Sequence, residues 1–299
     1  MDEAVNSEEG VIRPVGKSPK HIQIYHHPRV EKSERLADEI TRHLQKLGVE
    51  AEPVLFGDQA AALRLPEQDM IIVSGGDGTM LRSGNMAAPH GVPVLGINLG
   101  RLGFLPEVNY HDWKGPLARV IVGDYWLEER TMLHAEHHRG GELHNAFEVL
   151  NETVINRGGV ARPVRLRTYI DDHELTTFVA DGLIVATATG STAYALAAGG
   201  PILPPELKNI LILPISPHLC LDRAIVLAQG AHLRIHVRTE HYASLNADGM
   251  VHIELQDGDE VMVRMSQFAA RFVRVQEPVY FYRDLTARMN KNPSADKAK

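Results

Sequence analysis

Residues 70–79 read Met-Ile-Ile-Val-Ser-Gly-Gly-Asp-Gly-Thr, an apolar run that leads directly into a glycine-rich turn. Four consecutive apolar residues predict a short strand buried on both faces, which is typical of parallel sheets. The glycines that follow, Gly75, Gly76 and Gly78, can adopt positive φ and let a ligand approach the backbone closely. Ligands of open parallel sheets bind beyond the carboxyl ends of the strands, so we expect Asp77 to lie at a ligand-binding edge.

The glycine turn has two interpretations. As a binding site, its amide groups and the start of the helix that follows favour an anion, above all phosphate. A carboxylate there repels phosphate, so Asp77 would need a role, either accepting a proton from an attacking hydroxyl or helping to hold Mg²⁺. The alternative is an ordinary Asp-Gly turn. The stretch is neither a Walker A loop nor a Rossmann fingerprint, because Gly-Lys-Ser/Thr and the last glycine are missing.

The order of patterns along the chain predicts two kinds of architecture. The first half alternates apolar strand patterns, at 21–25 and 92–98, with a helical pattern at 31–47 that stops at Gly48. This alternation predicts a doubly wound parallel sheet. From about residue 126, short strand patterns separated by Gly, Asp and Asn predict a β-sandwich. We therefore expect an α/β fold plus an all-β fold, divided into a flexible arm at 1–19, a Rossmann-like α/β domain at 20–125, a β-rich domain at 126–276 and a C-terminal segment at 277–299 with a frayed end.

The composition limits the compartment and the kind of partner. The 299 residues carry a formal net charge of −7, which argues against a general nucleic-acid-binding surface. A single cysteine excludes an internal disulfide framework and a cysteine-rich zinc site, and it suits a cytoplasmic protein. The sequence has neither an apolar stretch of about 18 residues nor a signal-peptide pattern, so we expect no membrane span. The 16 histidines form no metal-binding motif, and we predict no metal ligands.

Two further stretches are candidate binding segments. Residues 96–108 carry three glycines, and Phe104 there could stack on a ring; the alternative is a structural crossover whose glycines permit tight packing. In the strand pattern at 147–157, Asn151 and Glu152 interrupt an apolar run, and buried polar groups need partners or a ligand. An amide can read a purine edge, and a carboxylate can accept from hydroxyls. Because neighbours in a strand face opposite ways, the alternative is that one of the two faces solvent.

The densest candidate stretch is residues 181–203. A buried strand pattern ends in Thr189-Gly190-Ser191-Thr192, and Ala193-Tyr194 then opens a helix of small residues. Hydroxyl groups at a helix start can serve as N-caps, which is the alternative interpretation. Three hydroxyls and a tyrosine exceed what one cap needs, and small residues let a ligand come close. We therefore favour a binding site here.

Together these motifs resemble the NAD kinase family. They are Gly-Gly-Asp-Gly-Thr, the glycine stretch that begins at 96, the Asn-Glu pair, Thr-Gly-Ser-Thr-Ala-Tyr followed by Gly-Gly-Pro, and Leu-Pro-Ile-Ser-Pro-His at 213–218, in the order found in the family. The resemblance implies that ATP, or in some members polyphosphate, phosphorylates the adenosine-ribose 2′-hydroxyl of NAD to give NADP. Mg²⁺ or another divalent cation would accompany the donor phosphates.

The resemblance also implies an architecture and an assembly. An N-terminal α/β domain precedes a C-terminal β-sandwich, and the segment 277–299 returns to the first domain. Members of the family form homodimers or homotetramers in which the NAD site lies between domains and borrows residues from a neighbouring subunit. The expected partners are NAD, ATP and further copies of the chain, without nucleic acid or membrane.

The resemblance assigns site residues position by position. Asp77 matches the base for the 2′-hydroxyl, and it is the one catalytic residue assigned. The residues expected to bind phosphate or NAD are Gly75, Gly76, Gly78 and Thr79 in the phosphate-facing loop, Phe104 at the adenine, Asn151 and Glu152 at the adenosine, Thr189, Ser191, Thr192, Ala193 and Tyr194 in the NAD pocket, and Asp181 and His218 at the nicotinamide end. Asp248 and Arg223 match family positions whose roles stay open.

The chain departs from the family pattern at two places, and other functions stay open. Ala188 stands where the family usually has proline, which should loosen the turn without removing a ligand group. Residues 219–224 also lack the usual proline. One alternative function is a lipid or other small-molecule kinase that shares the Gly-Gly-Asp-Gly-Thr turn, and another is a dinucleotide-binding module without catalysis. The sequence leaves the phosphate donor, NADH acceptance, oligomer size and feedback by NADP undecided.

Overall fold

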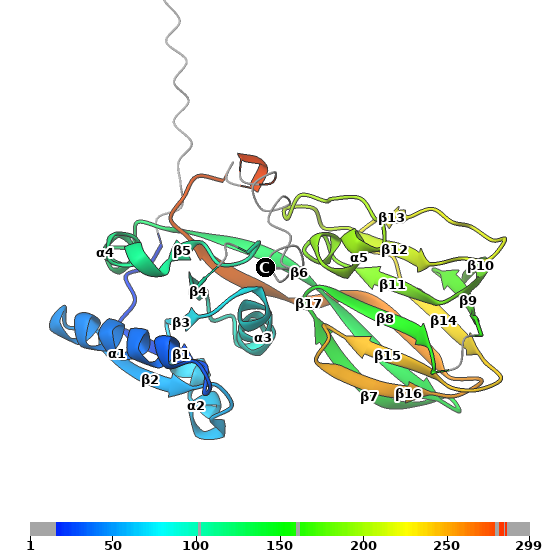
Figure 1. Cartoon of the computed structure of the whole chain (residues 1–299), viewed down its shortest axis with the longest axis horizontal. Coiled ribbons are helices and arrows are strands. Elements are labelled where there is room, and N and C mark those ends of the chain that lie inside the picture. Colours follow the sequence, from blue (N-terminus) through cyan, green and yellow to red (C-terminus); the bar gives the residue numbers. More distant parts are fainter. Residues whose placement is uncertain (1–15, 101–102, 160–161, 279–280, 284, 286–299) are drawn as a thin grey trace, which may run out of the picture.

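The computed structural model describes residues 16–100, 103–159, 162–278, 281–283 and 285. A helix-covered sheet and a pair of packed sheets lie side by side, and two long strands, β6 (Trp126–Arg139) and β17 (Glu260–Arg274), run between them (Figure 1). Most of the arm expected at 1–19, and most of the segment expected to return at 277–299, lie outside the described residues.

The first part is built on a parallel sheet. Its strands lie in the order β5, β4, β3, β1, β2, and every neighbouring pair is parallel. All five residues of β3 are buried, as the apolar run at its start predicts for a strand covered on both faces. The strands are β1 (His21–His26), β2 (Glu50–Leu55), β3 (Met70–Ser74), β4 (Val94–Asn98) and β5 (Val108–Asn109).

Helices cover both faces of this sheet. Ile72 of β3 packs with α1 and α4 on one face, whereas its neighbour Val73 packs with α2 and α3 on the other. The predicted helix that stops at Gly48 is present, and Gly48 has φ +80°. None of the helices among the described residues is long and apolar enough to cross a membrane. The helical elements of this part are α1 (Glu31–Lys46), α2 (Gln59–Leu63), η1 (Leu65–Glu67), α3 (Asp77–Ala87), η2 (Ala88–His90), η3 (Tyr110–Asp112) and α4 (Lys114–Ile121).

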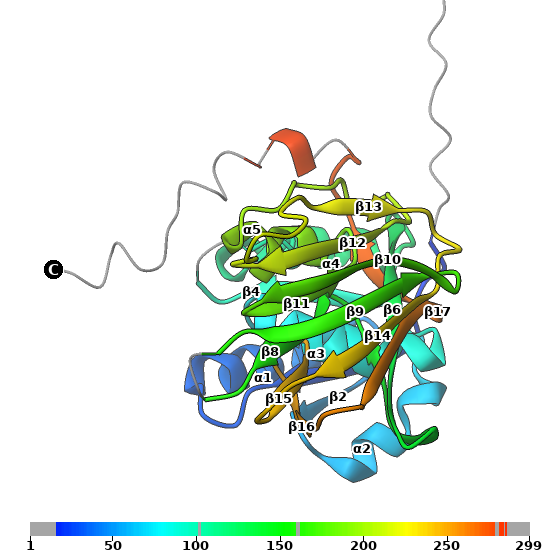
Figure 2. The same cartoon turned by 90° about the vertical axis from the view of Figure 1, so that its right-hand side faces the viewer.

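The second part is a sandwich of two antiparallel sheets, which faces the reader in Figure 2. One sheet has the order β13, β12, β11, β8, β15, β16, and the other contains β10, β9, β14, β17, β6 and β7. Their inner faces share one apolar core, to which Phe178 and Leu183 contribute from opposite sheets. The remaining elements are β7 (Glu142–Val149), β8 (Glu152–Arg157), β9 (Val164–Ile170), β10 (His173–Ala180), β11 (Gly182–Ala186), η4 (Gly190–Thr192), α5 (Tyr194–Ala197), β12 (Ile210–Ile215), β13 (Ile225–Leu227), β14 (Leu233–Arg238), β15 (Ala243–Ala247) and β16 (Val251–Leu255).

Strand β17 joins the two parts into one sheet of 11 strands. Near its start Val263 lies opposite Leu233 of β14, and near its end Phe272 lies opposite Val94 of β4. A strand of 15 residues is long enough to belong to both parts. The predicted fold class, α/β plus β-sandwich, is confirmed, and the structure adds the unbroken sheet that connects the two.

The structure differs from the sequence-based expectation at two places. Residues 147–157, expected as one strand, form the end of β7 and all of β8, with a bend at Leu150 and Asn151. The strand is interrupted because the carboxylate of Asp248 accepts the backbone N–H groups of residues 150–152. The helix expected after Ala193 is only the four-residue α5, since Gly199, with φ +86°, follows its C-cap.

A network of buried charged side chains lies where the two parts meet. Arg274 donates through Nε to Glu128 at 2.9 Å and through Nη1 to the carbonyl oxygen of Leu105 at 2.7 Å. Glu128 also pairs with Arg130 at 2.9 Å, and Arg130 donates to Thr189 Oγ1 at 3.3 Å. The three charged side chains are no more than 5% exposed, so each depends on the others to be tolerated there. The network connects the loop after β4 to the turn after β11.

We predict that Arg274→Met lowers the free energy of unfolding by about 3–5 kcal/mol, because a buried carboxylate and a buried carbonyl lose their donor. Urea denaturation of purified protein measures the change. Arg271→Met is the matched control, since Arg271 pairs with Glu129 on the surface, and its loss should be under about 1 kcal/mol. Equal losses in the two variants would contradict the structural role assigned to the buried network.

Candidate active site

Asp77 begins helix α3 at the carboxyl end of β3, and its carboxylate faces the loop that follows β4. Oδ2 accepts a hydrogen bond from the backbone N–H of Phe104 at 3.0 Å, and Oδ1 accepts one from Leu105 at 2.9 Å. A Cβ atom on Gly103 would lie 2.2 Å from Asp77 Oδ1, so only glycine fits there without a shift. Each carboxylate oxygen retains a further acceptor position, and Asp77 can therefore accept from a ligand hydroxyl while it stays held.

The two glycine-rich stretches lie side by side, as their sequence positions predict. The backbone N–H of Gly75 donates to the carbonyl oxygen of Ile97 at 2.9 Å. Gly75, Gly76 and Gly78 do not adopt positive φ, so the stretch is not a hairpin turn of the Asp-Gly type. The absence of a side chain matters instead at Gly75, where a Cβ would lie 2.4 Å from Thr79 Oγ1. Gly76 and Gly78 are exposed at the start of α3.

The bend between β7 and β8 presents Asn151 and Glu152. Asn151 is half-buried, and Glu152 is 9% exposed. The backbone N–H of Tyr194 donates to the Glu152 carboxylate, whose Oε2 has no hydrogen-bond partner among the described residues. Burial, and next the charge of Asp248, raise the pKa of Glu152 to about 8, while the Tyr194 N–H opposes this shift. Below that pH the carboxyl group is mostly neutral.

The turn after β11 packs directly on this bend. The backbone N–H of Thr187 donates to the carbonyl oxygen of Asn151 at 2.9 Å, and Thr187 Oγ1 donates to that of Leu150 at 2.6 Å. A Cβ on Gly190 would lie 2.1 Å from the carbonyl oxygen of Asn151, which explains the glycine. The structure therefore brings the Asn-Glu pair and the Thr-Gly-Ser-Thr turn together, although 35 or more residues separate them in the chain.

The hydroxyl groups of this turn are used within it. Ser191 Oγ donates to the carbonyl oxygen of Ala188 at 2.6 Å and accepts from the backbone N–H of Leu203 at 2.9 Å. Thr192 Oγ1 donates to the carbonyl oxygen of Thr189 at 3.0 Å. These side chains shape the turn, whereas Ala193 is half-buried and Tyr194 is 43% exposed.

Asp181 and His218 lie at the other end of β11. Asp181 immediately precedes that strand and pairs with Arg157 at 2.7 Å, and the backbone N–H of His218 donates to the carbonyl oxygen of Val179 at 2.7 Å. The five residues of β11 span roughly 17 Å. The structure therefore places these two residues about one strand length from the Thr-Gly-Ser-Thr turn.

A cavity of about 480 Å³ opens between α3 and the turn that joins β15 to β16. Gly78, Thr79 and Arg82 line it from α3, and Asp248 and Gly249 line it from the turn. The start of α3 and a turn of the sandwich thus share one open space, at the junction of the two parts of the molecule.

The sequence analysis did not identify several residues that organise this site. Asn85 donates to Asp248 at 2.7 Å, Arg130 reaches Thr189, and Gly103 makes room for Asp77. One available signal was the position of Asn85, eight residues after Asp77 and so a little over two turns along the same helix.

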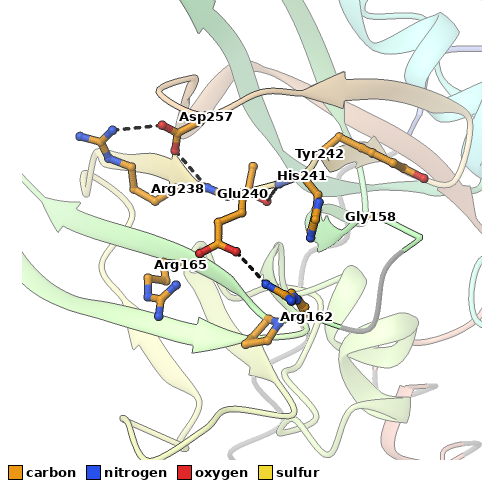
Figure 3. A pocket seen from close by; sticks show the side chains of 10 residues that line it. Gly158, Arg162, Arg165, Arg238, Glu240, His241, Tyr242 and Asp257 are labelled. Atoms are coloured by element: carbon orange, nitrogen blue, oxygen red, sulfur yellow. Dashed lines mark hydrogen bonds and ion pairs between the residues drawn. The ribbon is translucent and has the colours of Figure 1, made fainter.

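A separate pocket lies at the far end of β8 from Glu152 (Figure 3). Arg162 pairs there with Glu240 at 2.9 Å, and Arg238 pairs with Asp257 at 3.4 Å. None of its residues was a candidate in the sequence analysis. These exposed ion pairs neutralise most of the positive charge that lines the pocket.

Fold and site together define the class of two-domain kinases that carry a Gly-Gly-Asp-Gly-Thr turn. Residues 58–125 match the ATP-NAD kinase N-terminal domain, and residues 150–275 match the ATP-NAD kinase C-terminal domain. The chain belongs to the NAD kinase family, and the resemblance drawn from its motifs is confirmed.

Similar proteins support this assignment over most of the chain. The NAD kinase of Heliobacterium modesticaldum is 41% identical over 257 residues, which cover 84% of this chain and 91% of the relative. That of Chloroflexus aggregans is 38% identical and covers 91% of this chain and 99% of its own. Yeast NADH kinase, solved with NADH, superposes with a TM-score of 0.81 at 25% identity, covering 93% and 89% of the two chains. An Archaeoglobus fulgidus NAD kinase solved with ATP has a TM-score of 0.73 at 26% identity, covering 90% and 98%.

We predict that Glu152→Gln raises thermal stability by an amount that grows as pH rises from about 5 to about 8. In the folded protein the pKa of Glu152 is about 8 against an ordinary value of 4.5, so the folded state holds a proton that the unfolded chain releases. Stability contributed by this group is therefore lost as pH rises from about 4.5 to 8. Gln stays neutral, and its unfolding midpoint should lie near that of wild type at about pH 5 and at least about 4 °C above it at about pH 9.

The control for this variant is Glu254→Gln, at an exposed position on β16. Its midpoint should differ from wild type by the same small amount at both pH values. A Glu152→Gln variant with that pH-independent behaviour would show that Glu152 is not held neutral by its surroundings.

Proposed function

We propose that this protein transfers the terminal phosphate of ATP to the 2′-hydroxyl of the adenosine ribose of NAD, giving NADP. The observation that carries the proposal is the Asp77 carboxylate, held at a sheet edge by two backbone N–H groups with acceptor capacity to spare. Membership of the NAD kinase family supports the same reaction, and two structurally similar proteins were solved with NADH and with ATP.

In this proposal the acceptor dinucleotide lies across the sandwich end of the site. Phe104 contacts the adenine, and Asn151 and Glu152 hold the adenosine and its ribose. The turn after β11 lines the pocket through Thr189, Ser191, Thr192, Ala193 and Tyr194. Asp181 and His218 contact the nicotinamide half, and their distance along β11 suits the far end of an extended dinucleotide.

The donor phosphates would meet the loop formed by Gly75, Gly76, Gly78 and Thr79. Arg82, which lines the cavity beside Gly78, supplies positive charge at that position. Among the described residues, no group of three His, Cys, Asp or Glu side chains is arranged to hold a metal ion. This fits an ion carried by the donor, because Mg²⁺ is usually bound through substrate phosphates and few carboxylates. Such an ion would neutralise charge on the transferred phosphoryl group.

The chain's own contribution to the chemistry is alignment and proton acceptance. Asp77 accepts a hydrogen bond from the 2′-hydroxyl and takes its proton as the new O–P bond forms and the bond from the terminal phosphorus to the ADP leaving group breaks. Phosphoryl transfer passes through a loose transition state, so orientation of the hydroxyl matters more than early deprotonation. The amide groups at the start of α3 stabilise negative charge on the phosphates.

We further propose that the chain acts in the cytoplasm as a homodimer or homotetramer. We also retain the division into domains at 20–125 and 126–276. The start of β6 at Trp126 supports this division, and the family resemblance supports the assembly.

The first test uses Asp77→Asn. Purified wild-type protein with NAD, ATP and Mg²⁺ should form NADP, detected with an NADP-specific dehydrogenase, while diacylglycerol and sphingosine should not be phosphorylated. We predict that Asp77→Asn abolishes turnover and leaves the Kd for NAD within about tenfold, near 1.4 kcal/mol. Near-normal turnover of the variant would refute the role of Asp77, and wild-type protein that binds NAD without forming NADP would refute the kinase assignment.

A second test uses two glycines of the loop after β4. Gly103→Ala places a Cβ against Asp77 Oδ1, so we predict a loss in kcat of at least about a hundredfold, comparable to removing one aligned catalytic group. Gly100→Ala is the matched control, because no atom of the described residues lies within 4 Å of a Cβ at that position. Its kcat should stay within about twofold of wild type. Equal effects of the two changes on kcat would show that close packing at Gly103 does not orient Asp77.

A further inference from the structure

The carboxylate of Asp248 is the meeting point of four hydrogen bonds. Oδ2 accepts from Asn85 Nδ2 at 2.7 Å and from the backbone N–H of Leu150 at 2.8 Å. Oδ1 accepts from the backbone N–H groups of Asn151 and Glu152 at 2.8 and 3.1 Å. Asp248 is 7% exposed, and two donors at each oxygen leave no position for a proton. Burial raises the pKa of Asp248 above its ordinary value, and all four hydrogen bonds oppose that rise by favouring the ionised carboxylate.

The four donors come from two halves of the candidate active site. Asn85 lies on α3, the helix that begins with Asp77, and the three backbone donors form the bend that presents Asn151 and Glu152. Asn85 follows Asp77 by eight residues, a little over two turns along the same helix. Asp248 thus connects the helix of the expected base to the bend expected to hold the acceptor ribose.

The backbone at Asp248 is itself fixed. Asp248 and Gly249 have φ values of +50° and +64°, which form a type I′ turn between β15 and β16. The backbone N–H of Asp248 donates to the carbonyl oxygen of Glu152 at 3.0 Å, and β15 pairs with β8 up to Ala247 opposite Thr153. The carboxylate is consequently placed by two paired strands.

Two buried polar atoms beside Asp248 have no partner among the described residues, namely Asn85 Oδ1 and Glu152 Oε2. The amide of Asn85 must turn its NH₂ group toward Asp248, because an ionised carboxylate only accepts hydrogen bonds. This orientation leaves Oδ1 unsatisfied. Buried polar atoms without partners are disfavoured, so the contact with Asp248 dominates the placement of Asn85.

We propose that Asp248 is a positioning residue for phosphoryl transfer: through Asn85 and the bend at 150–152, it holds the acceptor-binding pair in register with Asp77. The proposal rests on the proposed function. A direct catalytic role does not fit Asp248, since donors already fill both of its oxygens. Misplacement of the acceptor by a fraction of an ångström lowers the rate of an aligned reaction, which gives the proposal a kinetic consequence.

The test begins with Asn85→Asp, assayed at about pH 9, because at lower pH a buried carboxyl group beside Asp248 can keep its proton and still donate. This nearly isosteric change replaces the donor to Asp248 by a like charge. We expect the KM for NAD to rise at least tenfold and kcat to fall, with an unchanged far-UV circular dichroism spectrum. Asn109→Asp is the charge control, since Asn109 is exposed, and its kinetics should match wild type.

Rescue distinguishes positioning from general damage to the fold. In the double variant Asn85→Asp with Asp248→Asn, one amide again faces one carboxylate, and asparagine tolerates the positive φ at 248. The amide nitrogen that replaces Oδ2 cannot accept from the backbone N–H of Leu150, so rescue is partial, and the KM for NAD should fall at least about threefold below that of Asn85→Asp. A destabilised fold would instead lower the active fraction, and so kcat, without raising KM, and a second substitution would not restore it.

The outcomes separate the two proposals. Wild-type protein that forms no NADP would overturn the proposed function. Wild-type activity together with unchanged kinetics in Asn85→Asp, or a double variant no better than Asn85→Asp alone, would overturn the positioning role and leave the proposed function standing. A raised KM for NAD that the double variant partly restores supports both.

Discussion

A carboxylate that leaves water must be matched by hydrogen-bond donors, and this constraint determines the backbone of the site. Asp77 is matched by two backbone N–H groups of the loop after β4, and Asp248 by three backbone N–H groups of the bend before β8. A side-chain donor can rotate away, whereas a backbone donor moves only with its segment. Each carboxylate consequently fixes the path of a chain segment that is remote in sequence, and the two segments are the ones that present Phe104 and the Asn-Glu pair.

The two parts of the molecule are joined in three independent ways. β17 continues from the sandwich into the parallel sheet, the buried charges connect Leu105 to Thr189, and Asn85 reaches Asp248. These links differ in chemistry and lie on different elements. With all three in place, the relative position of the start of α3 and the bend before β8 is largely set before any ligand binds. Such preorganisation is what an alignment-dependent reaction requires.

The sequence predicted the parts of this structure that local patterns determine. The buried strand and glycine turn ending at Thr79 and the helix ending at Gly48 follow from composition within about ten residues. The sequence pattern put the Asn-Glu pair inside a strand, whereas the structure has a bend there, which depends on Asp248, 97 residues after Asn151. Arg274 and Leu105 are 169 residues apart, and the sequence around neither residue predicts the hydrogen bond between them. An Asp-Gly turn is enough to account for Asp248 in its local sequence, so its neighbours in the chain gave no reason to expect its hydrogen bonds to Asn85 and to residues 150–152.

The same environment that places Glu152 and Asp248 close together also assigns them different charges. Burial raises the pKa of both carboxyl groups, but Asp248 has four donors and Glu152 has the Tyr194 N–H, so the ionised form is favoured more strongly at Asp248. Burial, and next the charge of Asp248, raise the pKa of Glu152 to about 8. Near neutral pH the ligand-free bend therefore presents one negative charge and one neutral acid, which lessens repulsion of an anionic dinucleotide and leaves Glu152 able to donate as well as accept. Were the donors shared equally, the two carboxyl groups would share one proton, and neither position would be preferred for the charge. The hydrogen bonds of Asp248 thus determine the protonation of its neighbour as well as its position.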